Sequence, residues 1–208
     1  MNSSTQRETV AGPAGSIECA IDLPTTVAEP RGTAIICHPH PQFGGTMDNK
    51  VVQTLARAVL QLGWRSVRFN FRGVGSSQGV WDEGVGEIAD ALAVIAARRE
   101  GPLLLAGFSF GGYVAASAAQ RLADDAKPAR LVLVAPSTAK QTVPGVPPET
   151  IVVQGEADDV VPLPATFDWA RPQSLPVIVL PGVGHFFHGQ LGLLKTVLVR
   201  ELLARDAL

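Results

Sequence analysis

Cysteines and long apolar segments are scarce in this sequence, and each scarcity excludes a class of protein. The 208 residues contain two cysteines, Cys19 and Cys37, and both stand in apolar, strand-like stretches. Two thiols are too few for a disulfide framework, so we expect both to be buried and free. The longest apolar runs, LVLVAP and VIVLPG, are far too short to cross a bilayer.

A surplus of positive charge is also lacking. The chain carries 17 lysines and arginines against 19 aspartates and glutamates, which gives a formal net charge of -2. The arginines are scattered rather than gathered in a run, so the sequence predicts no nucleic-acid partner. The first residues, MNSSTQRETVAGPAG, contain no apolar h-region. We therefore expect a cytoplasmic protein without a membrane partner.

The sequence does contain a regular alternation of strand-like and helix-like segments. The apolar runs of strand length are AIIC, SVRFNF, LLLAG, LVLVAP, TIVVQG and PVIVLPG. Stretches of helical period separate several of them, at residues 49–62, 85–98 and 111–122, and another closes the chain at 191–203. Before them, ETVAGPAGSIECAIDLP alternates around Gly15 as two antiparallel strands would.

This alternation predicts the fold class. Runs that are apolar on both faces, separated by amphipathic helices, are typical of a mostly parallel sheet between two helical layers. A length of 208 residues suits one domain over residues 1–208, because a second core would be cramped. We expect an α/β fold: a three-layer sandwich with a doubly wound sheet and an antiparallel N-terminal strand pair. Such sheets place active sites at the carboxyl ends of their strands.

The segment LLLAGFSFGGYVAASAAQRLA carries the strongest chemical signal. Ser109 stands between Gly107 and Gly111, directly after a buried strand and directly before an alanine-rich helix. Gly-x-Ser-x-Gly in this setting is typical of a nucleophile elbow, whose tight turn has no room for side chains at the two glycines. The helix that begins at Phe110 directs its free N–H groups toward the place where an oxyanion would form. An incidental serine in a glycine-rich turn is the weaker interpretation.

Candidates for the base and its orienting acid follow two later strands. A serine hydroxyl needs a base within hydrogen-bond reach, and the base needs a carboxylate. Glu156, Asp158 and Asp159 follow the strand TIVVQG, and spacing alone does not separate the two aspartates. His185 and His188 follow the last strand. The order serine, acid, histidine is the one expected on such a sheet.

These motifs resemble those of the alpha/beta hydrolase superfamily, and more narrowly its small, lidless bacterial serine hydrolases related to dienelactone hydrolases. The resemblance covers residues 32–189. In that family the acid sits in a Gly-x-x-Asp loop, which implies Asp158, with Asp159 as the fallback. The base follows a glycine-containing turn, which implies His185 and leaves His188 to line the cleft or cap a backbone group.

Two positions depart from the family pattern. Gln154 stands where a histidine is common, and Gly184 stands where another small or acidic residue is common; we expect neither difference to touch the triad. Many enzymes of this fold insert a lid after the sixth strand. Here the corresponding segment, STAKQTVPGVPPE, is only a loop, so we expect an open site.

The stretch ICHPHPQFGG, residues 36–45, holds the remaining two histidines, each followed by a proline. In hydrolases of this fold, the loop at this position supplies a second oxyanion N–H group. Pro39 has no N–H to donate, so the resemblance implies the backbone N–H of His40 beside that of Phe110. A metal site at His38 and His40 is the weaker interpretation, because no third ligand is at hand. We expect no metal.

The loop RFNFRGVGSSQGVWDEGVGE resembles the glycine loop of the same superfamily. Its glycines are spaced one residue too widely for a dinucleotide fingerprint, and they do not open the next helix directly. We therefore expect no cofactor and no cofactor-binding residues.

The sequence thus predicts a carboxylesterase-like serine hydrolase whose catalytic residues are Ser109, Asp158 and His185. The phenylalanines close to them in sequence are Phe43, Phe108, Phe110, Phe186 and Phe187. An open cleft near such rings suits a small-molecule substrate with a small or short-chain acyl group. Thioesterase, amidase or lactone hydrolase activity with the same triad is the alternative among enzymes. A non-catalytic binding module on the same fold is the alternative outside them.

Overall fold

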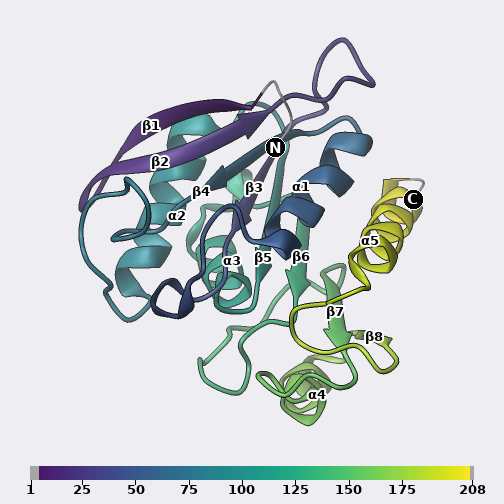
Figure 1. Ribbon diagram of the computed structural model, residues 1–208. Coiled ribbons are helices and arrows are strands. Elements are labelled where there is room, and N and C mark those ends of the chain that lie inside the picture. Colours follow the sequence, from purple (N-terminus) through teal and green to yellow (C-terminus); the bar gives the residue numbers. More distant parts are fainter. Residues whose placement is uncertain (1–4, 207–208) are drawn as a thin grey trace.

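Eight strands form one sheet in the structure, a computed structural model that describes residues 5–206 (Figure 1). The strands are β1 (Gln6–Gly12), β2 (Gly15–Asp22), β3 (Thr33–Cys37), β4 (Arg65–Phe69), β5 (Leu103–Phe108), β6 (Arg130–Val134), β7 (Ile151–Gly155) and β8 (Ile178–Leu180). Their order across the sheet is β1-β2-β4-β3-β5-β6-β7-β8. The β1–β2 and β2–β4 pairs are antiparallel, and all the other neighbouring pairs are parallel. The predicted sheet, with its antiparallel N-terminal pair, is confirmed.

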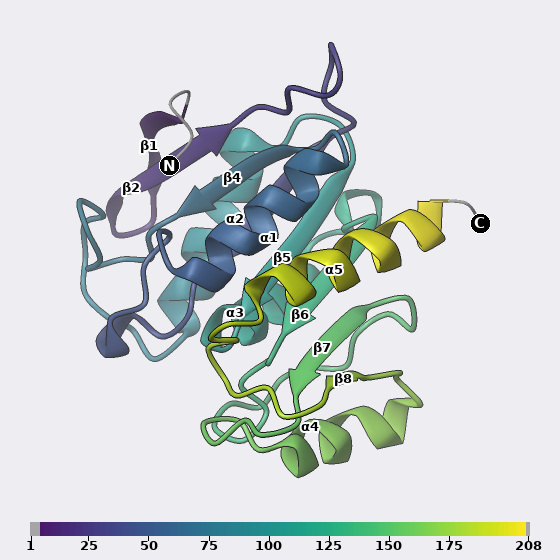
Figure 2. The same cartoon turned by 45° about the vertical axis from the view of Figure 1, so that its right-hand side comes forward.

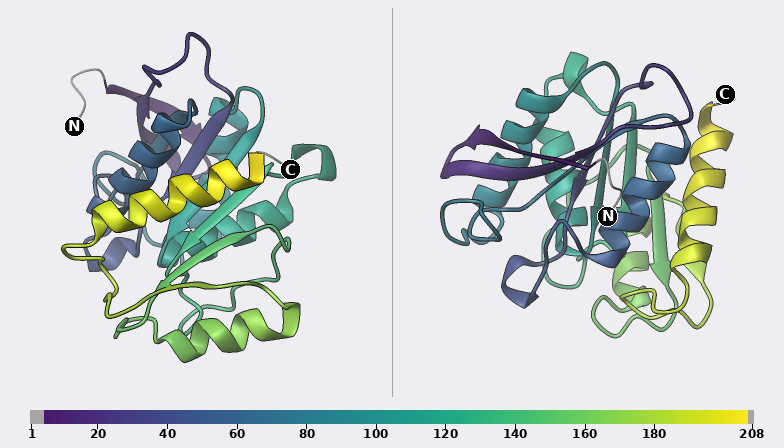
Figure 3. Two further views of the ribbon diagram at one scale, coloured as in Figure 1. Left: turned by 90° about the vertical axis from the view of Figure 1, so that its right-hand side faces the viewer. Right: turned by 45° about the horizontal axis from the view of Figure 1, so that its top comes forward.

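Helices cover both faces of the sheet. They are α1 (Lys50–Gln61), α2 (Val85–Arg98), α3 (Phe110–Arg121), α4 (Leu163–Ala170) and α5 (Leu191–Asp206), and the short 3-10 turns are η1 (Pro41–Phe43), η2 (Asp124–Ala126) and η3 (Arg171–Gln173). Figure 2 shows α1 and α5 side by side in front of the sheet, with α2 and α3 behind it. The right-hand view of Figure 3 shows the strands between these two helical layers.

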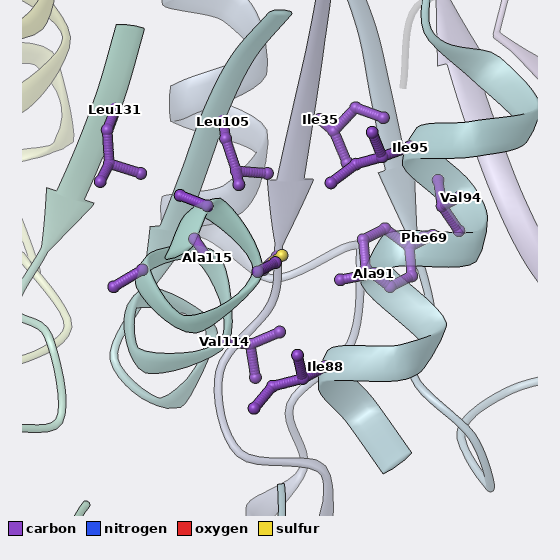
Figure 4. Packing of buried hydrophobic residues seen from close by; sticks show 14 of the residues in the cluster. Ile35, Phe69, Ile88, Ala91, Val94, Ile95, Leu105, Val114, Ala115 and Leu131 are labelled. Atoms are coloured by element: carbon purple, nitrogen blue, oxygen red, sulfur yellow. The ribbon is translucent and has the colours of Figure 1, made fainter. Parts of the chain in front are cut away.

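Successive residues of the central strands contribute to two separate cores. Ile35 and Leu105 belong to the cluster that packs against α2 and α3 (Figure 4). Their neighbours Ile36 and Leu104 belong to the cluster that packs against α1 and α5. Side chains alternate across a strand, so a strand covered on both faces must be apolar at every position. This explains the unbroken apolar runs in the sequence.

The chain changes its direction across the sheet at β3. From β3 it passes through α1 to β4 on one side, and it then returns through α2 to β5 on the other side. In open α/β sheets, ligands bind outside the carboxyl ends of the strands at such a switch point. The loops that follow β3 and β5 therefore flank the position where a site is expected.

One helix of the structure was not predicted. Helix α4 has eight residues and carries prolines at its N-cap and in its first turn, Pro162 and Pro164. Prolines in a short segment are typical of a loop, yet the first turn of a helix tolerates them because its N–H groups have no helical partner. Residues 137–149, where a lid would be inserted, contain neither helix nor strand. The predicted absence of a lid is confirmed.

The two cysteines are buried free thiols, as predicted. Burial raises the pKa of the Cys19 thiol to about 12. None of the helices between residues 5 and 206 combines the length and the apolar character that a membrane crossing requires.

Candidate active site

Ser109 occupies a sharp turn between β5 and α3. Its φ of 57° and ψ of -119° lie outside the regions that most residues adopt. The flanking glycines allow the turn to close: a Cβ at Gly107 would collide with the carbonyl group of Gly111. A Cβ at Gly111 would collide with the carbonyl groups of Cys37, the last residue of β3, and of His38, the first residue of the following loop. The structure therefore contains the strand, turn and helix that the motif predicts.

The Ser109 hydroxyl begins a series of hydrogen bonds. Its Oγ lies 3.1 Å from Nε2 of His185, and Nδ1 of His185 lies 2.7 Å from Oδ2 of Asp158. The three side chains follow β5, β8 and β7, and all are buried. When Nδ1–H donates to the carboxylate, Nε2 is the nitrogen that accepts a proton from the serine. The tertiary structure thus brings together three residues that are far apart in the sequence.

Asp158, rather than Asp159, is the carboxylate that reaches the histidine. Its Oδ1 accepts hydrogen bonds from the N–H groups of Val160 and Val161, at 2.9 and 2.7 Å. Asp159 is exposed to solvent. Two charge-assisted bonds from the backbone fix the orientation of the Asp158 carboxylate.

A further side chain, Gln154, belongs to this network. Its Nε2 donates to Oδ2 of Asp158 at 2.9 Å and to the carbonyl oxygen of Val161 at 2.9 Å. Its Oε1 accepts from the Thr166 hydroxyl at 3.1 Å. Gln154 and Thr166 are both fully buried. The expectation that the departure at Gln154 leaves the triad untouched is wrong, because its amide shares Oδ2 with His185.

A cleft of about 280 Å³ opens over Ser109. Its walls come from the loop after β3, the turn after β6, the start of α3 and the loops after β7 and β8. Phe43 and Phe186 line it with exposed rings, and Phe110 lines it although its ring is buried; Phe108 and Phe187 lie in the core. The cleft is therefore largely apolar around the serine hydroxyl.

Several backbone N–H groups at the cleft have no acceptor within residues 5–206. Among them are those of Phe110, the first residue of α3, and of His40, which precedes η1. The first N–H groups of a helix are left without a partner by the helical pattern itself. Both amides remain the predicted oxyanion hole, at the positions implied by the resemblance.

Known proteins share both the sequence and the fold of this chain. Residues 28–163 match the protein family described as serine aminopeptidase, S33. The solved structure of an alpha/beta serine hydrolase without a lid from Xanthomonas campestris is 39% identical, with 97% of this chain and 95% of that chain covered and a TM-score of 0.88. An alpha/beta serine hydrolase homologue from Coxiella burnetii is 43% identical, with 95% and 97% covered and a TM-score of 0.86. The chain belongs to this family of alpha/beta serine hydrolases.

A curated relative of the hydrolase matches over a shorter stretch. It is an uncharacterized protein of Rickettsia prowazekii (strain Madrid E), 41% identical over 109 residues, which are 50% of this chain and 45% of that protein. The match thus spans less than half of the relative's length.

His38 of this hydrolase is a structural histidine. It is fully buried, its Nδ1 lies 2.6 Å from the carbonyl oxygen of Pro39, and its Nε2 accepts the N–H of Phe71 at 3.0 Å. Burial lowers its pKa to about 3, so the ring is neutral. Both ring nitrogens are engaged, which leaves neither for a metal. Among residues 5–206, no group of three or more histidine, cysteine, aspartate or glutamate side chains is placed to hold a metal ion.

His40 turns its ring toward aromatic neighbours. The ring centroid lies 4.5 Å from that of Trp81 and 5.0 Å from that of Phe110. Burial, followed by the positive charge of Lys140, lowers the pKa of His40. The side chain is thus a neutral part of the cleft wall, and the backbone N–H of His40 is the group predicted to bind the oxyanion.

His188, the competing histidine, lies beside the cleft and does not line it. It lines a separate hollow beside Asp48 and Lys50, and its ring centroid lies 5.7 Å from that of Phe186. The final helix begins only at Leu191, so His188 lies in the loop before it. His185 is therefore the histidine of this loop that reaches Ser109. Both roles expected for His188 are wrong, because within residues 5–206 its ring neither lines the same cleft nor forms a hydrogen bond to a backbone group.

Proposed function

We propose that this hydrolase is a carboxylesterase-like enzyme that cleaves small or short-chain acyl esters through an acyl-enzyme on Ser109. The observation that carries the proposal is the unbroken hydrogen-bonded series from Asp158 through His185 to Ser109 beside a cleft. A non-catalytic binding module would have no need of this series of hydrogen bonds.

The two buried free thiols bear on the location of the protein. Free thiols are typical of a reducing compartment, which supports a cytoplasmic location.

The same geometry describes the first half of the reaction. Oγ of Ser109 attacks the ester carbonyl carbon while its proton passes to Nε2 of His185. Asp158 holds the ring in place and stabilises the imidazolium. The negative charge that forms on the carbonyl oxygen is met by the N–H groups of Phe110 and His40. The imidazolium then protonates the leaving alkoxide, and the acyl group stays on Ser109.

Water completes the second half of the reaction. With no lid over the cleft, water reaches the acyl-enzyme directly. His185 takes a proton from the attacking water and later returns it to the Ser109 oxygen as the carboxylic acid leaves. No step needs a group beyond the side chains and amides already named.

The size of the cleft supports a small acyl group. Its volume of about 280 Å³ is slightly below the range of about 300–1,000 Å³ that is typical of small-molecule sites. The exposed rings of Phe43 and Phe186 offer apolar contact to a short chain.

Hydrolysis of peptides from a free amino end is the second candidate, because the matched family is described by that activity. A carboxylate near the scissile bond is the strongest partner for the free α-ammonium group of a peptide. No aspartate or glutamate is among the described residues that line the cleft, and Lys140 is among them. The charge of the cleft therefore favours esters over this alternative.

The test compares the wild type with Ser109→Ala on short-chain 4-nitrophenyl esters. We expect the variant to lose about 10⁴-fold or more in kcat, because the nucleophile is removed. A fluorophosphonate probe should label the wild type at Ser109 and leave the variant unlabelled. Equal ester turnover by the two proteins would show that the proposal is wrong.

A further inference from the structure

The cleft of the hydrolase contains one charged side chain with no role in the reaction described above. Lys140 is the only lysine or arginine among the described residues that line it, and no carboxylate lines it. We propose that the preferred esters carry a free carboxylate remote from the scissile carbonyl, and that Lys140 binds it. This inference rests on the proposed function and names the substrate class of the same site.

The backbone that carries Lys140 is anchored to the nucleophile itself. The N–H of Ser137 donates to the carbonyl oxygen of Ser109 at 3.2 Å, and the N–H of Lys140 donates to the carbonyl oxygen of Ser137 at 3.2 Å. Two successive hydrogen bonds therefore join the turn after β6 to the nucleophile elbow. Such an anchor gives the lysine backbone a defined position relative to the reacting hydroxyl.

The lysine side chain reaches toward the opposite wall of the cleft. Its Nζ lies 5.9 Å from the ring centroid of Phe43, a residue of η1 that is 79% exposed. Lys140 and Phe43 come from loops after different strands, and both line the cleft. The contact of an ammonium with an exposed ring is weak. A carboxylate of the substrate can therefore take the place of the Phe43 ring beside the Lys140 ammonium.

No carboxylate of the described residues is paired with this ammonium. Within residues 5–206, Lys140 forms no ion pair. Asp158, the carboxylate of the hydrogen-bonded series, does not line the cleft, and it is buried and bonded to His185, Gln154 and two backbone N–H groups. A substrate carboxylate would therefore form an ion pair with Lys140 without displacing a carboxylate of the described residues.

The start of α3 adds to the positive character of the cleft. The N-terminal end of a helix carries a partial positive charge, and α3 begins directly beside Ser109. The imidazole of His40, which lies in the same wall, is neutral because burial and Lys140 lower its pKa. The field in the cleft thus attracts anionic esters and repels cationic ones.

The test uses two substrates of equal chain length that differ in charge, mono(4-nitrophenyl) glutarate and 4-nitrophenyl pentanoate, with the spontaneous rates subtracted. We expect the ratio of kcat/KM, glutarate over pentanoate, to fall about twofold to fivefold in Lys140→Met, the range expected when a solvent-exposed charge pair is lost. Lys140→Glu should lower the ratio further, because the charge is reversed. A second pair, 4-acetoxybenzoate and its methyl ester, shows whether a carboxylate on the alcohol side is bound instead.

Lys195→Met is the matched control. It removes the same charge from α5, where Lys195 lines a different hollow, and it should leave both ratios at the wild-type value. Raising the salt concentration should lower the wild-type ratio and leave that of Lys140→Met unchanged, since exposed charges are screened.

The outcomes separate this inference from the proposed function. Equal ratios in the wild type and in both Lys140 variants, for both substrate pairs, would overturn the role of Lys140 while ester turnover lost in Ser109→Ala still upholds the esterase. If Ser109→Ala hydrolyses both esters as fast as the wild type, the proposed function fails, and the inference fails with it.

Discussion

At the scale of single residues, Asp158 is the most heavily bonded side chain of the site. Its two oxygens accept hydrogen bonds from Val160, Val161, Gln154 and His185. The motif Gly-x-Ser-x-Gly identifies Ser109 without a structure, because strand, turn and helix can all be recognised from the sequence. The choice between two adjacent aspartates depends on which carboxylate turns inward, and that is a property of the folded loop.

Gln154 shows what local patterns miss. It stands in a strand that is apolar on either side, and a polar residue there gives no sign of its partners. In the structure its amide bonds Asp158 and Val161 and is itself held by Thr166. We infer that Gln154 is a positioning residue for the triad.

We predict that Gln154→Glu lowers kcat with little change in KM, because Gln154 does not line the cleft. The substitution keeps the shape of the side chain but replaces the N–H donor with a carboxylate oxygen facing Asp158. Loss of the bond and repulsion between like charges should destabilise the protein by about 2 kcal/mol or more. Ester kinetics and urea unfolding at neutral pH measure the two effects.

Thr166→Val is the control for this prediction. It removes only the hydroxyl that holds the far end of Gln154, so its effect on kcat should be smaller. If Gln154→Glu kept the wild-type kcat, Gln154 would have no positioning role.

At the scale of elements, the site depends on the close approach of α3 to the end of β3. Gly111 lies so near the carbonyl groups of Cys37 and His38 that no Cβ fits between them. These contacts are with backbone atoms of neighbouring elements, so a small side-chain movement cannot relieve them. The glycine spacing of the motif is therefore a requirement of the packing between the two elements.

We predict that Gly111→Ala destabilises the protein by about 3 kcal/mol, and that it lowers esterase activity by displacing Ser109. Gly192→Ala is the matched control: Gly192 lies in α5, and a Cβ added there would meet no atom within 4 Å. That substitution should leave activity unchanged and should stabilise the protein by up to about 1 kcal/mol, because alanine favours a helix. Thermal unfolding together with ester kinetics compares the two; equal stability would contradict the packing argument.

The elements themselves differ in how well the sequence predicts them. The parallel strands are unbroken apolar runs because two helical layers cover them, and α1, α2 and α3 show a helical period next to them. Helix α4 was missed because it is short and begins with prolines. The loop after β8 was also misjudged, since His188 lies there without reaching the cleft.

At the scale of the whole molecule, His38 couples stability to pH. The ring is buried and bonded to Pro39 and Phe71, so it bridges the loops that follow β3 and β4. Burial lowers its pKa from 6.5 to about 3 in the folded protein. In the unfolded chain the ring takes up a proton below pH 6.5, and in the folded protein it does not until the pH is far lower. Protonation therefore favours unfolding as the pH falls through this window.

We predict that His38 alone reduces the free energy of unfolding by about 2 kcal/mol between pH 7 and pH 5. His38→Gln should be less stable than the wild type at pH 7 and should show a flatter dependence on pH. The exposed His188 provides the control, and His188→Gln should keep the wild-type slope. Urea unfolding at several pH values measures the slopes; parallel curves for wild type and His38→Gln would contradict the prediction.

The sequence by itself determined the fold class, the serine in the elbow motif and the order of the proposed catalytic residues. These are local properties: apolar periodicity, glycine where a turn must close, and motifs that follow recognisable strands. Only the tertiary structure decided that Asp158 faces His185, that Gln154 supports it, and that Lys140 reaches the cleft toward Phe43. Each of these depends on the direction of a side chain in a loop or on contacts between segments far apart in the chain. No local periodicity records such directions, because they are set when the strands bring their loops together at one edge of the sheet.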